Sequence, residues 1–108
     1  MPTVVENLNV LLSEMDAIRE GDRTLLDRML VLAYTDSGYA KNHTTDNIPM
    51  ITAGNAGGRM KTGIHFAAAK GDPVTRVSLT VQQAMGLPVS SFGTESNKTS
   101  KTITEVMA

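Results

Sequence analysis

Residues 42–63, NHTTDNIPMITAGNAGGRMKTG, place one of the two histidines of the chain close to a five-residue patch with three glycines. The first feature suggests a metal site and the second a phosphate site. A phosphate-binding P-loop needs a glycine directly before Lys-Ser/Thr, whereas Met60 precedes Lys61 here. The glycines therefore predict a tight connection with positive φ angles. Arg59 and Lys61 could still meet an anion, although two basic residues on a turn are usually solvated.

The two histidines have ordinary structural explanations. A lone histidine in a polar loop, such as His43, is usually exposed or hydrogen-bonded to backbone, and His65 has no potential ligand beside it in the sequence. Asp36, followed by Ser and Gly, is typical of a tight turn. No Ser-His-Asp set can be assigned from scattered hydroxyls and two histidines.

The elements that position these residues begin with an amphipathic helix over residues 3–19. Its apolar stripe follows helical spacing, and Gly21 is expected to end it in a left-handed conformation; the stripe consists of Val4, Leu8, Leu11, Met15 and Ile18. A short helical turn leads into the apolar run MLVLAYT (29–35), which predicts a strand buried on both faces. The polar segment 36–47 predicts a loop, at the strand end where open α/β sheets bind ligands.

The second half of the chain predicts one strand, a glycine-rich turn and one helix. IPMITAG (48–54) reads as a strand with Pro49 at its start or edge, and the following turn allows a small hairpin that puts Ile64 and Phe66 on one face. For the helix within 71–86, we expect Asp72 as N-cap and Gly86 as left-handed stop. Its apolar face comprises Val74, Val77, Val81, Ala84 and Met85.

The C-terminal stretch predicts a tail. We expect one α/β domain over residues 1–92 and a Ser/Thr/Lys-rich tail over residues 93–108, which is mobile unless it docks. Within it, TITEV reads as a last strand.

Composition narrows the function classes. The chain has 108 residues, a net charge of -1 and no cysteine. A chain of this length can form a stable core without a metal or disulfide. The absence of cysteine excludes thiol chemistry and zinc ribbons. The chain has ten basic and eleven acidic residues, so it lacks the excess of basic residues that nucleic-acid binding needs. Neither a signal peptide nor a membrane span is predicted.

Three landmarks in order carry a family resemblance: EGDRTLLDRMLVL, NHTTDNIPMITAGNAGGRMKTGIHF and MGLPVSSFG. Over about residues 8–92, the chain resembles the C-terminal part of the domain-of-unknown-function family fifteen-fifty-two, bacterial proteins similar to the alkaline-phosphatase and sulfatase superfamily. The resemblance implies an α/β/α sandwich in which MLVLAYT and IPMITAG are strands of the sheet. It also implies an exported parent protein, hence a periplasmic or secreted location.

The resemblance also implies two metal ligands. In the superfamily, the turn after the first of these strands often supplies an acidic and an imidazole ligand. Here Asp36 is retained, while Ser37 stands at the second position, where a hydroxyl is a poor ligand for zinc. The family also tends to carry a His-x-His pair before the second strand. In this chain His43 occupies the first position of the pair, and Thr45 replaces the second histidine. His43 and Asp36 are thus the candidate metal ligands, with zinc as a possible ion in a longer parent protein.

Two functions follow from these observations. In the first, the chain is the C-terminal part of a metal-dependent hydrolase-like protein, inactive alone and completed by a missing N-terminal portion. In the second, it is a non-catalytic interaction module that forms a homo-oligomer through exposed strand edges. A small-ligand domain built on the glycine-rich turn would need converging polar groups that the sequence does not show. Neither nucleic acid nor membrane is an expected partner.

Overall fold

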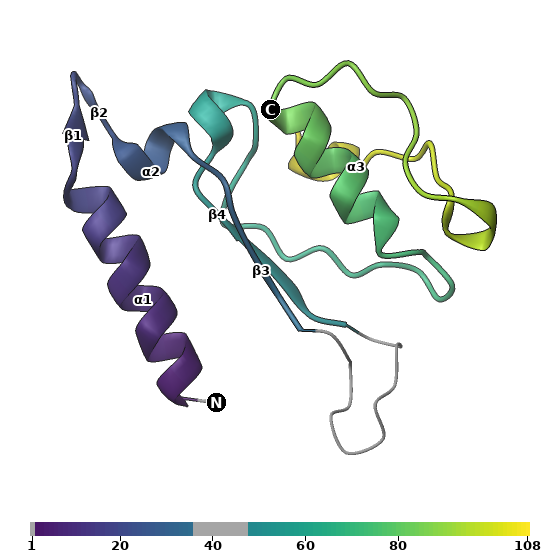
Figure 1. Cartoon of the computed structure of the whole chain (residues 1–108), viewed down its shortest axis with the longest axis horizontal. Coiled ribbons are helices and arrows are strands. Elements are labelled where there is room, and N and C mark those ends of the chain that lie inside the picture. Colours follow the sequence, from purple (N-terminus) through teal and green to yellow (C-terminus); the bar gives the residue numbers. More distant parts are fainter. Residues whose placement is uncertain (1, 36–47) are drawn as a thin grey trace.

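The computed structural model describes residues 2–35 and 48–108 as a mixed α/β chain with short elements (Figure 1). In chain order these are α1 (Pro2–Ala17), β1 (Arg19–Glu20), β2 (Arg23–Thr24), α2 (Leu25–Arg28), β3 (Val31–Tyr34), β4 (Met50–Ala53), η1 (Ala56–Gly58), α3 (Thr75–Ala84), η2 (Glu95–Asn97) and η3 (Thr104–Val106). The predicted α/β class is confirmed at this coarse level.

The described strands form two separate antiparallel pairs, β1–β2 and β3–β4. In the second pair, Val31 lies opposite Ala53 and Tyr34 opposite Met50. The strand predicted within residues 29–35 is confirmed, but its burial on both faces is not: Val31, Leu32 and Ala33 are half-buried and Tyr34 is exposed. The difference arises because β3 packs mainly on β4 in the described chain, so its two faces are not covered by layers of helices.

The helix predicted over residues 3–19 is confirmed as α1, which ends at Ala17. Gly21 has the expected positive φ of 69°, but it lies in the turn between β1 and β2 and does not end the helix. The next helix, α2, starts with a capping box: Thr24 Oγ1 accepts from the Asp27 backbone N–H, and the Asp27 carboxylate accepts from the Thr24 N–H.

The glycine-rich turn follows β4 directly and contains η1. Gly54 has a φ of 87°, and a Cβ atom there would collide with the Met29 carbonyl oxygen, so only glycine lets β4 approach α2 this closely. The Ala56 backbone N–H donates to the same Met29 carbonyl. No hairpin follows: the only bridge of residues 55–66 in the described chain joins Met60 to Met107.

The helix predicted within residues 71–86 is confirmed as α3, although its N-cap prediction is wrong. Val74 occupies the N-cap, because Asp72 instead accepts from the Ala69 N–H and pairs with Arg76. The stop at Gly86 is confirmed, with a φ of 90°. Hydrogen bonds from Gly86 N–H to Gln83 and from Leu87 N–H to Gln82 complete a Schellman motif.

The C-terminal tail docks on α3 (Figure 1). Thr80 Oγ1 accepts from the buried Ile103 N–H at 2.9 Å, and the Thr102 hydroxyl donates to Gln83. The last strand predicted at TITEV is wrong: residues 104–106 form the 3-10 helix η3. The segment divides its backbone hydrogen bonds between Thr80 of α3, which accepts from the Ile103 N–H, and Lys61, which donates to the Val106 carbonyl, so it does not continue along one neighbouring strand.

The core is small for a chain of this length. Its buried apolar residues come mainly from the glycine-rich turn, α3 and the tail: Met15, Ala56, Met60, Leu79, Ala84 and Ile103. The radius of gyration is 15.0 Å, whereas a compact domain of this length has about 13 Å. The described chain therefore leaves much of its apolar surface uncovered.

Candidate functional site

The two candidate metal ligands, Asp36 and His43, lie outside the described residues. The segment that contains them connects β3 to β4, whose ends meet at the Tyr34–Met50 pair. Within residues 2–35 and 48–108, no group of three His, Cys, Asp or Glu side chains is placed to hold a metal ion. The metal site therefore remains a prediction from the resemblance.

The glycine-rich turn uses its own backbone groups, as expected for a tight connection. The Asn55 side chain accepts from the Gly58 N–H at 3.2 Å, and the Asn55 carbonyl accepts from the N–H groups of Gly58 and Met60. Ala56, Gly57 and Gly58 all have positive φ angles. Because these amide groups bond within the turn, they do not form a phosphate cradle.

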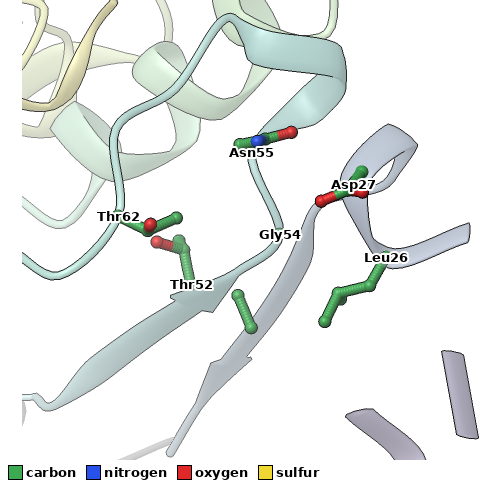
Figure 2. Close-up of a pocket in the computed structure, with 7 residues that line it drawn as sticks. Leu26, Asp27, Thr52, Gly54, Asn55 and Thr62 are labelled. Atoms are coloured by element: carbon green, nitrogen blue, oxygen red, sulfur yellow. The ribbon is translucent and has the colours of Figure 1, made fainter. Parts of the chain in front are cut away.

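A shallow pocket of about 340 Å³ lies between α2 and the start of this turn (Figure 2). Its polar lining consists of Asp27, Thr52, Asn55 and Thr62. Asp27 and Asn55 are already used as helix caps, while Thr52 and Thr62 are exposed. Hydrogen bonding to the Thr24 backbone N–H lowers the pKa of Asp27, so this carboxylate is ionised near neutral pH and serves the cap. No local sequence pattern indicates this pocket, because the segments that line it lie far apart in the chain.

A larger groove of about 1610 Å³ lies between β4 and α3. Most of its lining is apolar, including Met50, Ile64, Phe66, Val77 and Val81. This volume exceeds that of ordinary small-molecule pockets. His65 is exposed and lines the groove, and the carboxylate of the described lining, Asp72, is bound to Arg76 and therefore not free to act with His65 as an acid–base pair.

Arg76 is the most connected polar side chain of the groove wall. Its guanidinium donates to the carbonyl oxygens of Lys101 and Thr102, contacts the Asp72 carboxylate at 2.7 Å, and lies 5.5 Å from the centre of the Phe66 ring. The Arg76 hydrogen bond lowers the pKa of Asp72. The cluster joins α3, the segment before it and the tail, which is a structural role that sequence spacing alone did not indicate.

Comparison of the chain with protein-family models, with curated proteins and with solved structures found no match. None of the helices in the described part of the chain is sufficiently long and apolar to cross a membrane.

Proposed function

We propose that this chain is the C-terminal portion of an exported alkaline-phosphatase or sulfatase-like protein and is not catalytic alone. The portion belongs to an α/β/α sandwich whose remaining elements cover its apolar surfaces. Residues 36–47 border a site in the parent protein, where Asp36 and His43 contribute to binding a divalent metal such as zinc. One or two ligands hold zinc weakly, because structural and catalytic sites use three or four protein ligands.

The uncovered apolar surface is the observation that supports this proposal. The strand β3 has the nearly continuous apolar run of a strand covered on both faces, yet its side chains are only half-buried or exposed. An antiparallel pair such as β3–β4 is compatible with the edge of a mixed sheet, and mixed sheets are common in sandwiches of this kind. A surface of this type is stable when further strands and helices pack on it.

The test is zinc binding and hydrolysis by the purified chain, compared with the double variant Asp36→Asn, His43→Ala. We expect no turnover of p-nitrophenyl phosphate or p-nitrophenyl sulfate, and a zinc dissociation constant that is weak and rises in the double variant. His65→Ala serves as the matched control and should leave zinc affinity unchanged. Turnover that requires His43, or zinc binding that is tight and independent of both ligands, would contradict the proposal.

A second candidate function is a non-catalytic module that self-associates. The observation in its favour is that β3 pairs with only one strand in the described chain and that its residues carry no charge. Unprotected apolar edges of this kind pair readily with other chains. Light scattering on the native chain, with and without zinc, distinguishes the two functions: a zinc-independent dimer favours the module, whereas a monomer excludes it.

A further inference from the structure

Apart from its shortness, the outer edge of β3 lacks the features that usually protect an edge strand in the described chain. Within the described chain, β3 forms a ladder with β4 alone, through the four residue pairs from Val31–Ala53 to Tyr34–Met50. Natural edge strands are protected by charges, prolines, bulges or a covering helix. Residues 30–34 read LVLAY, without charge or proline, and form no bulge against β4.

The other elements do not supply that protection. The helix α1 packs mainly on α2 and β2, and Figure 1 shows it running on the far side of α2 from α3. Its own apolar side chains Val4, Val5 and Leu11 are exposed, so α1 does not bury itself against the sheet. By contrast, β4 is preceded by Pro49 and lines the groove shared with α3. The β3 edge is therefore the better template for a new strand.

We propose that the β3 edge pairs antiparallel with β3 of a second copy of this chain, which gives a four-stranded sheet in the order β4–β3–β3–β4. This inference rests on the self-associating function proposed above and names its interface. A two-fold axis through the contact makes the same strand both donor and acceptor of the pairing, as closed dimers require. Two uncharged strands can lie opposite each other without the like-charge repulsion that would oppose the pairing.

The apolar composition of β3 also favours a second copy as the occupant. Every side chain from Leu30 to Tyr34 is apolar or aromatic, so identical strands present matching surfaces on both faces of the new sheet. Antiparallel pairs are slightly more stable per residue than parallel pairs, and they form without a crossover connection. The pairing also covers side chains of β3 that are half-buried in the single chain.

Cysteine scanning tests this interface directly, because the chain contains no cysteine of its own. Single variants Val31→Cys, Leu32→Cys, Ala33→Cys and Tyr34→Cys are oxidised under non-denaturing conditions, with Thr52→Cys on β4 as control. Only residues near the two-fold axis of an antiparallel pair come within disulfide range. We expect one or two β3 variants to form covalent dimers efficiently, while Thr52→Cys does not.

Light scattering on Leu32→Lys provides an independent measurement, with Thr52→Lys as the control for charge. Because the pairing brings one introduced lysine from each copy into the same short interface, we expect the dimer dissociation constant to rise at least about 10-fold in Leu32→Lys only. A native dimer whose β3 cysteines never cross-link would overturn the β3 interface but not self-association. A native monomer at all concentrations would overturn both. Circular dichroism checks that each variant folds.

Discussion

The two longer helices of this chain differ in what covers their apolar side chains. In α3, Leu79 and Ala84 are fully buried, and the tail is hydrogen-bonded onto the helix. In α1, Val4, Val5 and Val10 remain 58–61% exposed, and Met15, at 7% exposure, is the one buried apolar side chain of the described helix. The C-terminal half thus packs its helix against its own tail, whereas the N-terminal half leaves most apolar side chains of its helix exposed.

The strongest test of this contrast is Leu79→Ala. Leu79 is fully buried, so its truncation removes apolar contacts and leaves a cavity. We expect a loss of about 2–5 kcal/mol in the free energy of unfolding. Urea denaturation measures it, and Leu79→Met, which nearly conserves volume, should cost less than about 1.5 kcal/mol. Equal midpoints for wild type and Leu79→Ala would show that α3 is not packed as described.

The next largest effect is expected for Arg76→Ala, which releases the tail. The variant loses two hydrogen bonds to tail carbonyl groups, the ion pair with Asp72 and the contact with Phe66. Because the side chain is mostly buried, we expect a loss of about 2–4 kcal/mol. Hydrogen exchange should speed up at residues 99–103. Lys98→Ala removes an exposed charge nearby and should change stability by less than about 0.5 kcal/mol.

Thr80→Val isolates a single hydrogen bond of the same contact. Thr80 Oγ1 accepts from the Ile103 N–H and donates to the Arg76 carbonyl, and valine has nearly the same shape without the hydroxyl. The Ile103 N–H is then buried without a partner, which should cost about 1–3 kcal/mol. Thermal unfolding measures the loss. Thr80→Ser keeps the hydroxyl and should recover most of it; an equal loss in both variants would point to packing instead.

Local sequence patterns predicted the helices of this chain, but not the polar contacts between its distant segments. The apolar spacing of α1 and α3, and the glycine at position 86, act within a few residues, so the helices and the helix stop were predicted. Asp72 was expected to cap α3, but Arg76 four residues later competes for its carboxylate. TITEV has strand-like composition, yet one of its main partners is Thr80 of α3, a contact over 23 positions that no local pattern contains.

The candidate site was less predictable for a different reason. The apolar run of β3 correctly indicated a strand, but its burial depends on neighbours outside the pair with β4. Asp36 and His43 were proposed from the resemblance and lie outside the described residues, so their role stays a prediction. The Arg76 cluster and the groove were missed because each combines residues from three or more separate segments.

A pH titration examines the ion pair within the C-terminal half. The Arg76 hydrogen bond lowers the pKa of Asp72 below its ordinary value of 3.8. Because the folded-state pKa is lowered, the stabilisation is fully present above the unfolded-state value and is lost as the pH falls through the lowered pKa. Urea midpoints of wild type and Asp72→Asn should therefore differ at neutral pH and converge below pH 3.8. If the two urea midpoints differed by the same amount at every pH, the effect would come from the asparagine amide itself and not from the loss of the Asp72 charge.

The smallest expected effect completes the comparison between the two helices. Leu11→Ala makes in α1 the same change as Leu79→Ala makes in α3, but Leu11 is half exposed and leaves no cavity. Alanine is also a slightly better helix former than leucine, so the loss in unfolding free energy of the monomer should be below about 1 kcal/mol. Urea denaturation at a protein concentration low enough to keep the chain monomeric measures it. If Leu11→Ala costs as much as Leu79→Ala, then α1 is packed within its own chain and does not offer its apolar face to a partner.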